Sequence, residues 1–517
     1  MSGKVVIVGA GPGGLASALL LAQSGHEVTV LERRSEIGGR TSQLREGGFT
    51  WDLGPTFFLY PRVLDEILQE SGRRLADEIQ LERLDPQYRI SFGAGGHLDA
   101  TADVARMEQE IARLCPEDAP GFARFLSDNR GKLNAFRSVL ERPFLSWRDL
   151  CKPDLLKALP LLRPSRSLNG DLGRFFSDER VRLAFSFQSK YLGMSPFRCP
   201  SLFSILSFLE YEYGVYHPVG GCHALMQMLA RCAREDGVTI RTGEEVEELE
   251  FEGRRVKALR TSNGRYESDA VVLNADFARV MHRLVPERLR RRWSDKKLKK
   301  SRYSCSTYMM YLGVDGEVDL PHHTIHISRD YERNLREIEK DHVLSQDPSF
   351  YVANPCVTDR TMAPSGKSAL YVLVPVTQEN PNVDWKQSEL PFRELVLDKL
   401  SQIGLSDIRE RILVEKRFTP ADWNQQLEVH LGATFNLSHD LGQMLLLRPR
   451  NKFEDLDGVY LSGGGTHPGS GLPVIFESSR IARRLIDQDL GVASSLRSRG
   501  RVWPFRRGRT LPLETAS

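Results

Sequence analysis

The chain has 517 residues, which is long enough for two or more lobes around a sizeable core. Its 71 Lys and Arg residues nearly balance its 68 Asp and Glu residues, so the overall charge gives no case for a nucleic-acid partner. Its seven cysteines are odd in number and include no C-x-x-C pair, which argues against a disulfide scaffold or a metal site and favours a reducing cytoplasm.

The N-terminal residues have the pattern of a βαβ unit. Residues 4–8, KVVIV, predict a strand, residues 12–25 a helix that ends at Gly25, and residues 26–32, HEVTVLE, a second strand. This order of elements indicates a parallel sheet. The N-terminus lacks a signal-peptide pattern, and no run approaches the roughly 18 apolar residues of a spanning helix, so we expect no membrane-crossing segment.

Later elements alternate between two regions. Helical patterns are frequent between residues 66 and 160, whereas residues 220–276 read as a helix and short strands that return to the first region. Strand-like runs follow at 306–314, 348–355, 368–376 and 458–461, and a closing helix at 475–491. We therefore predict one domain built from residues 1–75, 216–295 and 446–491, an inserted domain built from 76–215 and 296–445, and a basic, flexible tail at 492–517.

Two basic runs each leave two interpretations open. The tail has six Arg residues before any acid, with Trp503 and Phe505 among them, and is either a solvated tail or an anchor to anionic lipid. For the second run, residues 288–302, RLRRRWSDKKLKKSR, a solvated helix face is as good an interpretation as a surface anchor.

A glycine-rich turn follows the first strand. Gly9, Gly11 and Gly14 form G-x-G-x-x-G, in which the glycines allow a tight turn, a close approach of a pyrophosphate and close packing of helix on strand. Glu32, at the end of the second strand, can accept hydrogen bonds from a ribose hydroxyl and would repel a 2′-phosphate. These residues leave NAD and FAD open.

The next motif narrows the choice of cofactor. Gly38 and Gly39 bring backbone close to a ligand, and Arg40 can bind a diphosphate through two hydrogen bonds. Together with the D-x-G-P-T of FTWDLGPT, these motifs resemble the superfamily of flavin-binding amine oxidases and carotenoid desaturases, which binds FAD.

Within that superfamily the chain resembles the bacterial and fungal phytoene desaturase family. The similarity lies in FTWDLGPT, YGVYHPVGGCHALMQMLA, NPCVTDRTMAPSGKSALYVLVPV and GTHPGSGLP, and it extends over roughly residues 4–490. It implies an α/β fold with a Rossmann-like, GR2-type FAD-binding domain assembled from three segments. It also implies an inserted α+β substrate domain that includes a helical lobe.

The resemblance implies the FAD contacts residue by residue. By motif they are Gly9, Gly11, Gly14, Glu32, Arg33, Gly38, Gly39, Arg40, Gly54, Pro55, Thr56, Val246, Gly464, Gly465, Gly471, Leu472, Pro473 and Val474. Val246 corresponds to the residue whose backbone meets adenine, and the last helix places its positive end under the flavin ring. This chain departs from the family in reading LPVIFES where I-P-G is usual, and we expect Glu477 to face water.

The catalytic candidates are Asp149 and Arg148. FLSWRDLCK resembles a family stretch, although Lys152 replaces the usual last Arg, and a desolvated Asp149 would have a raised pKa suited to proton transfer. A surface ion pair is the alternative interpretation. His467 is expected to order its turn, and aromatic residues of AFSFQSKYLG, SLFSILSFLEYEYGVY and STYMMYL are candidates for a substrate tunnel.

The resemblance implies a desaturase that introduces double bonds into a C40 or C30 polyene such as phytoene or diapophytoene. An isomerase or end-group oxidase acting on a carotenoid would keep the same cofactor residues, and a prenyl-lipid carrier of the dissociation-inhibitor type would share the architecture without flavin. The implied partners are a hydrophobic polyene, the inner face of the cell membrane as a peripheral attachment site, and oxygen or a quinone as electron acceptor.

Overall fold

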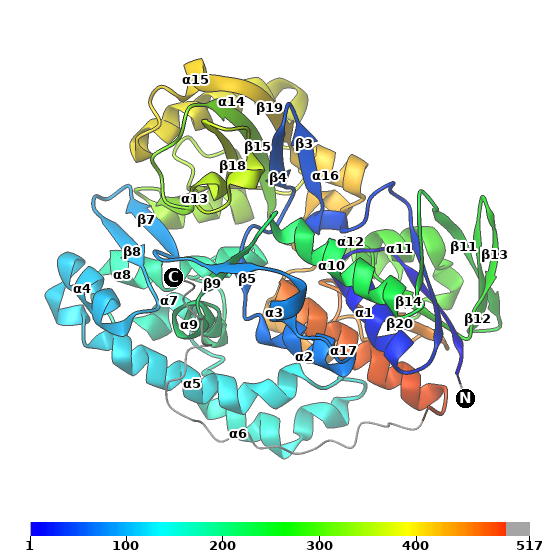
Figure 1. Ribbon diagram of the computed structural model, residues 1–517. Helices are drawn as coiled ribbons and strands as arrows, with labels where there is room; N and C mark the ends of the chain where they lie inside the picture. Colours follow the sequence, from blue (N-terminus) through cyan, green and yellow to red (C-terminus); the bar gives the residue numbers. More distant parts are fainter. Residues whose placement is uncertain (1, 493–517) are drawn as a thin grey trace.

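The computed structural model describes residues 2–492 and contains a five-stranded parallel sheet, which lies on the right in Figure 1. Its strand order is β10-β2-β1-β14-β20, with β1 at Lys4–Val8, β2 at Glu27–Glu32, β10 at Thr239–Thr242, β14 at Ala270–Leu273 and β20 at Val459–Leu461. The strands come from three distant parts of the chain. The expectation of an α/β fold with a Rossmann-like sheet assembled from three segments is therefore confirmed.

Helices cover one face of this sheet and a small antiparallel sheet lies against the other. The helices are α1 at Pro12–Gln23, α10 at Cys222–Glu235 and α17 at Leu472–Asp489, and the small sheet consists of β11 at Val246–Glu252, β12 at Arg255–Thr261 and β13 at Gly264–Glu267. Helix α1 is buried along most of its length because it packs between α10, α17 and the sheet. Its sequence is accordingly apolar on all sides.

A seven-stranded sheet forms a second layer. Its order is β19-β15-β18-β17-β16-β7-β8, and only the β16–β7 pair is parallel among its described neighbours. The bounds are β7 Tyr88–Phe92, β8 His97–Ala100, β15 Ser306–Asp315, β16 His323–Ile327, β17 Phe350–Ala353, β18 Lys367–Val376 and β19 Ile412–Phe418. Helix α14, Trp385–Leu400, packs its apolar residues on the outer face of this sheet.

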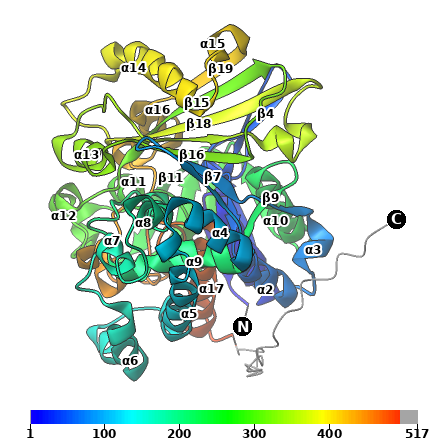
Figure 2. The ribbon, with the colours of Figure 1, turned by 90° about the vertical axis from the view of Figure 1, so that its left-hand side faces the viewer.

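A helical lobe lies beside the seven-stranded sheet (Figures 1 and 2). It comprises α4 Val104–Leu114, α5 Gly121–Leu140, α6 Pro153–Leu162, α7 Leu168–Leu172, α8 Glu179–Ala184 and α9 Ser204–Tyr213. Its aromatic core is continuous with β7 and β16, so the lobe and the sheet share one hydrophobic cluster. The shorter elements are β3 Gln43–Glu46, β4 Phe49–Asp52, β5 Phe58–Leu59, α2 Arg62–Glu70, α3 Leu75–Glu78, β6 Leu81–Arg83, β9 Val215–Pro218, α11 Phe277–Leu284, α12 Asp295–Lys300, α13 Tyr331–Arg336, α15 Ile408–Arg411 and α16 Pro420–Leu427.

Three tyrosines of the seven-stranded sheet hold the loop that follows β4. The hydroxyl of Tyr311 donates to the carbonyl oxygen of Leu53 at 2.6 Å, and that of Tyr371 donates to the carbonyl oxygen of Gly54 at 2.7 Å. The Tyr351 hydroxyl lies 2.7 Å from Thr56 Oγ1. These bonds tie the seven-stranded sheet to a loop that belongs to the N-terminal part of the chain. We name residues 53–56 the LGPT loop.

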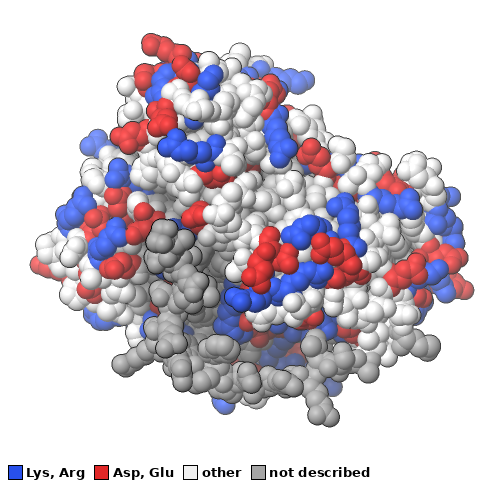
Figure 3. Space-filling view, in the orientation of Figure 1, with Lys and Arg blue, Asp and Glu red and all other residues white. Residues whose placement is uncertain are grey.

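The strands and helices expected at residues 4–32, 220–276, 306–376 and 458–491 are present at those positions. The division of the chain into domain ranges remains a proposal. The basic run at 288–302 begins in a single helical turn, Glu287–Leu289, and includes the short helix α12. The expected tail lies outside the described residues from 493 onward. Within residues 2–492, no helix combines the length and apolar character that crossing a membrane would require. Acidic and basic side chains are interspersed on the face in Figure 3, as the balanced composition suggests.

Candidate functional site

One continuous cavity of about 620 Å³ extends from the carboxyl edge of the parallel sheet to the seven-stranded sheet and the helical lobe. The end at the parallel sheet is polar and includes glycine backbone, Glu32 and several arginines. The other end is walled by apolar side chains, among them Phe187, Leu206, Ile325, Phe350 and Leu373. The size lies within the range of about 300–1,000 Å³ for ligand sites. The gradient from polar to apolar suits a charged cofactor next to a hydrocarbon.

The turn after β1 has no room for side chains. Gly9 has a φ of +99°, and a Cβ there would overlap the carbonyl oxygen of Asn274. A Cβ on Gly14 would overlap the carbonyl oxygen of Gly9, so Gly14 lets α1 pack closely on the strand. Gly9 and Gly11 line the cavity at the N-terminus of α1, where unpaired amides favour an anion.

Glu32 is fixed at the end of β2 and lines the same part of the cavity. Its Oε2 accepts from the amide of Ala10 at 2.8 Å, and its Oε1 accepts from the amide of Arg34 at 2.9 Å. Each carboxylate oxygen keeps a further lone pair that can accept from a hydroxyl. Arg33 and Val246 line this end as well, so the residues expected around an adenosine lie together.

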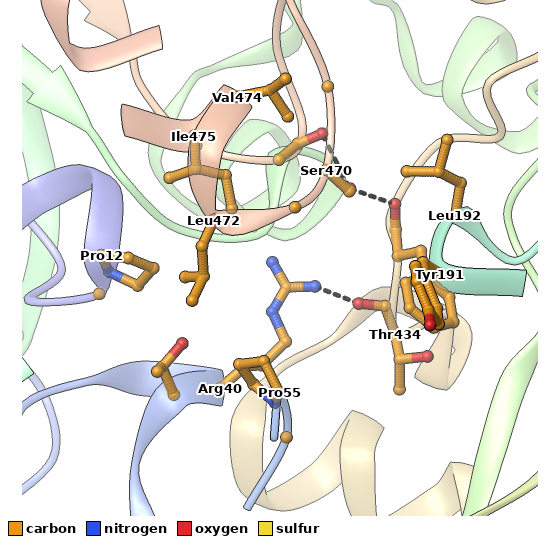
Figure 4. Close-up of a pocket in the computed structure, with 18 of the residues that line it drawn as sticks. Pro12, Arg40, Pro55, Tyr191, Leu192, Thr434, Ser470, Leu472, Val474 and Ile475 are labelled. Atoms are coloured by element: carbon orange, nitrogen blue, oxygen red, sulfur yellow. Dashed lines mark hydrogen bonds between the residues drawn. The ribbon is translucent and has the colours of Figure 1, made fainter. Parts of the chain in front are cut away.

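Arg40 lies inside the cavity between the glycine turn and the C-terminal turn. Figure 4 shows its guanidinium with Pro12 and Leu472 on one side and Thr434 on the other. Its Nη1 donates to the carbonyl oxygen of Thr434 at 2.6 Å. Burial lowers the pKa of Arg40, and the nearby Asp276 opposes that shift. A guanidinium in this position is ready to bind a diphosphate with two parallel hydrogen bonds.

The C-terminal turn forms the wall opposite Arg40. Gly464, Gly471, Leu472, Pro473 and Val474 line the cavity, and Gly471 has a φ of +113° immediately before α17 begins. The first turn of α17 therefore presents its positive end to the cavity. Ser470 Oγ donates to the carbonyl oxygen of Phe435 at 2.8 Å and holds the turn in place (Figure 4).

Most residues expected to contact FAD line this one cavity. Of the eighteen residues, Gly14, Gly38 and Gly465 do not line the cavity. Each of these three glycines packs behind a turn. Because two glycine turns, a ribose acceptor and a buried arginine converge, the residues present fit a bound FAD. The individual contacts remain proposals.

The expectation that Asp149 is a desolvated base is wrong. Its Oδ2 accepts from the amide of Ser146 at 2.9 Å, and its Oδ1 pairs with Lys152 Nζ at 3.0 Å. Burial would raise the pKa of Asp149, but these hydrogen bonds outweigh burial and lower it to about 2. Neither Asp149 nor Arg148 is among the described residues that line the cavity. The surface ion pair, which was the alternative, fits the geometry.

Glu477 does not face water as expected. It is 4% exposed, lines the cavity, and pairs with Arg480 at 3.0 Å. Burial raises the pKa of Glu477, although Arg480 opposes the shift. His467 has its ring against Phe144 and its Nε2 3.3 Å from the carbonyl oxygen of Val139, so it orders the turn from outside the cavity.

The sequence pattern missed polar residues that follow β14. Asn274 and Asp276 line the cavity, and Asp276 caps α11 by accepting from the amide of Arg279. The carboxyl ends of parallel strands meet at one edge of the sheet, so their position directly after the strand was a usable signal. Thr434 lies on a loop without a motif and gave none.

A buried carboxyl lies behind the apolar end of the cavity. Glu210 is 0% exposed, and its Oε2 accepts from Tyr88 Oη at 2.8 Å and from Gln188 Nε2 at 3.0 Å. Burial raises the pKa of Glu210 to about 7, although these hydrogen bonds oppose the shift. Tyr191, which lines the cavity, is a further neighbour of this carboxyl.

Comparison with known proteins adds independent findings. A family model described as flavin containing amine oxidoreductase matches residues 12–485. A 4,4'-diapophytoene desaturase (4,4'-diapolycopene-forming) from Methylomonas sp is 44% identical, with 94% of this chain and 95% of the relative covered. A phytoene desaturase (lycopene-forming) from Pseudescherichia vulneris is 34% identical, with 94% and 99% covered. An oxidoreductase from Methanosarcina mazei matches with a TM-score of 0.61 at 18% identity over 94% and 100% of the chains, which shows the fold.

Replacing Arg40 tests the cofactor end of the cavity. We expect Arg40→Ala to weaken FAD binding by about tenfold to a hundredfold, because a hydrogen bond to a charged group contributes about 1.5–3 kcal/mol. Arg40→Lys keeps the charge but loses the planar guanidinium. Its affinity for FAD should therefore lie between that of the wild type and that of Arg40→Ala. Titration of apoprotein with FAD, followed by absorbance, measures the effect. Arg74→Ala, at an exposed position outside the cavity, is the control; equal affinities for all variants would contradict the assignment.

Glu210 makes a pH-dependent contribution to stability. Its pKa is about 7 in the folded protein and near 4.5 when unfolded, so between these values only the folded state holds the proton. The free energy of unfolding should therefore fall as pH rises through this window, by on the order of 1 kcal/mol per pH unit. We measure thermal midpoints of the wild type and Glu210→Gln from pH 4.5 to 8. The wild-type midpoint should fall relative to that of the variant as the pH rises to about 7, and the difference should then level off. Parallel curves would refute this expectation.

Proposed function

The chain belongs to the flavin containing amine oxidoreductase family and is an FAD-dependent oxidoreductase, and from this premise we propose that it desaturates an acyclic polyene such as diapophytoene or phytoene. The observation that carries the proposal is the single cavity in which the expected flavin turn and a long apolar wall meet. According to their names, the two relatives described above are desaturases of diapophytoene and phytoene.

The apolar wall suits a hydrocarbon that has no polar groups. Phe187 and Tyr191 come from one expected tunnel segment, and Leu202, Ile205 and Leu206 come from the next. Burial of apolar surface contributes about 25 cal/mol per Å², so a long polyene gains binding free energy without any hydrogen bond. The third expected segment contributes only Thr307, because its aromatic residues are buried within the sheet itself.

The division of labour follows from the two ends of the cavity. When bound, the flavin supplies the chemistry of hydride acceptance from an allylic carbon. The chain's own residues align the polyene along the apolar wall and exclude water from it. Arg40 and the first turn of α17 hold the charged cofactor at the boundary between the polar and apolar ends.

Pigment formation tests this function directly. We expect the protein, produced in cells that accumulate diapophytoene or phytoene, to convert at least one of them into a product with longer-wavelength absorption. Leu206→Trp, which fills the apolar end, should reduce conversion while the FAD content stays unchanged. Extracts analysed by chromatography and absorbance give the readout, and assays without oxygen, with and without added quinone, identify the electron acceptor. A flavin-loaded protein that converts neither precursor would disprove the function.

We propose further that the protein attaches peripherally to the inner face of the cell membrane through α6 and the turn before it. Trp147 is 67% exposed and Leu156 52% exposed, and Leu159 and Leu161 are exposed as well. Helix α6 packs against α5, whose other residues wall the cavity, and it projects at the edge of the molecule in Figure 2. Exposed Lys152 and Lys157 lie in the same segment and can attract anionic lipid.

Vesicle binding tests this surface. We expect the double variant Leu156→Asp and Leu159→Asp to lose membrane affinity by at least about tenfold, because burial of one leucine contributes about 1.5–3 kcal/mol. The matched control is Leu390→Asp with Leu413→Asp, two exposed leucines on α14 and β19. Cosedimentation with vesicles that contain anionic lipid measures both. Equal losses in the two double variants would exclude α6 as the attachment surface.

A further inference from the structure

The guanidinium of Arg40 is held by protein groups along two of its three edges. On one edge, Nη1 donates to the carbonyl oxygen of Thr434 at 2.6 Å (Figure 4). On the edge between its two terminal nitrogens, the side-chain oxygen of Asn436 accepts from Nη1 at 3.0 Å and from Nη2 at 2.9 Å. A guanidinium has five N–H groups, so these contacts use three of them.

The two N–H groups that remain lie side by side on the third edge. They belong to Nε and to Nη2, and within residues 2–492 neither of them donates to a protein group. In the pair of Arg89 with Asp99, the same edge binds both oxygens of a carboxylate, from Nε at 2.7 Å and from Nη2 at 2.8 Å. Such an edge binds a phosphate equally well through two parallel hydrogen bonds. Because Arg40 lines the cavity, its third edge is available to an anion bound there.

The side-chain amide of Asn436 has one orientation that satisfies both of its neighbours. With its oxygen toward Arg40, its nitrogen donates to Oδ2 of Asp276 at 2.8 Å. The reverse orientation would place the amide nitrogen against the guanidinium donors and the amide oxygen against a carboxylate. Asn436 therefore lies between the Arg40 and Asp276 side chains, which form no direct ion pair within residues 2–492.

The backbone of Asn436 is fixed in a conformation that suits asparagine. Its φ is +64°, in the left-handed region that Asn adopts more readily than most residues. Its carbonyl oxygen accepts from the amide of Ser304, and its own amide donates to the carbonyl oxygen of Ala433, both at 2.9 Å. A Cβ on Gly464, in the C-terminal turn, would lie 3.3 Å from the Asn436 side chain. The side-chain amide therefore has little room to move away from Arg40.

We propose that Asn436 is a positioning residue that orients Arg40 for the cofactor diphosphate. It occupies the end of the guanidinium and separates it from Asp276, so that the edge formed by Nε and Nη2 stays free. Without the amide, the guanidinium can pair with the Asp276 carboxylate, and that pair would compete with the diphosphate for the same N–H groups. Asn436 is not among the described residues that line the cavity, so it acts through Arg40. This inference rests on the proposed contact of Arg40 with FAD and not on the identity of the polyene.

A double-mutant cycle on FAD affinity tests this role. We expect Asn436→Gly, which removes the amide but tolerates the positive φ, to weaken FAD binding to the apoprotein by about tenfold. In an Arg40→Ala background the same substitution should change the affinity by less than about twofold, because no guanidinium remains to be oriented. Absorbance titration measures all four proteins. Equal losses in both backgrounds, or no loss in the wild-type background, would overturn the proposal.

Two further variants separate orientation of Arg40 from a general effect on the fold. Asn436→Ala removes the same amide at a different backbone cost, and it should show the same coupling to Arg40. Asn451→Ala is the matched control, because Asn451 is also buried and donates to the carbonyl oxygen of His467 at 2.8 Å. It should lower the thermal midpoint of the apoprotein and have the same effect on FAD affinity with or without Arg40. Coupling of Asn451 to Arg40 as strong as that of Asn436 would contradict the proposal.

Competition by nucleotides tests the diphosphate contact itself. ADP carries a diphosphate and AMP a single phosphate, and both displace FAD without supplying a flavin ring. We expect Asn436→Gly and Arg40→Ala each to lower the ratio of ADP affinity to AMP affinity by about tenfold, and Asn451→Ala to leave it unchanged. An unchanged ratio in Asn436→Gly would show that Asn436 does not act at the diphosphate and would overturn the proposal.

These measurements need no polyene, so they separate the positioning role from the proposed function. If the flavin-loaded wild type converts neither precursor, the proposed desaturation is wrong, and the cycle still decides the role of Asn436. If a precursor is converted while Asn436→Gly binds FAD as the wild type does, the positioning role is overturned and the function stands. If Arg40→Ala itself binds FAD as the wild type does, the diphosphate contact and the role of Asn436 are both wrong.

Discussion

The site depends on hydrogen bonds that join two sheets through one short loop. Tyr311 and Tyr371 donate to consecutive carbonyl oxygens of the LGPT loop, and Tyr351 meets its last side chain, Thr56. The loop also packs against Arg40, since a Cβ on Gly54 would overlap the Arg40 carbonyl oxygen. The position of the cofactor end relative to the apolar end is therefore set by a few buried bonds, which are strong because water cannot compete for them.

Charge is distributed unevenly along the cavity. The cofactor end contains Glu32, Arg40 and Asp276, each fixed by backbone or side-chain partners, whereas the other end is walled by aliphatic and aromatic groups. Burial raises the pKa of Asp276 and lowers that of Arg40, and each opposes the shift of the other. A buried charge is stable only with such a partner. An anionic diphosphate and a hydrocarbon can thus be held in one space without either facing the wrong surroundings.

The parts of the site that the sequence predicted are those encoded by local backbone requirements. Gly9, Gly14 and Gly471 are needed where a Cβ or an ordinary φ would not fit, and that need is visible in the spacing of the motif. Asp149 was misread because its pKa depends on Ser146 and Lys152, whose geometry no motif records. The positions of the strands along the chain could be anticipated from hydrophobic runs and turns, whereas their order in the two sheets could not. Contacts such as that of Tyr351 with His323 join separate strands, so their residues give no pattern along the chain.

The three-segment construction of the parallel sheet has a consequence for how the protein is made. β1 pairs with β14, and β14 pairs with β20, so the sheet is incomplete until residues near the C-terminus have been synthesised. At about 5–20 residues per second, the roughly 450 residues between β1 and β20 take from about 20 to 90 seconds to emerge. The central strand β1 lacks one partner until β14 has emerged, and β14 in turn lacks one partner until β20 follows. The cavity wall that α17 supplies is likewise among the last parts to be made, so a coenzyme can be fully enclosed only late in synthesis.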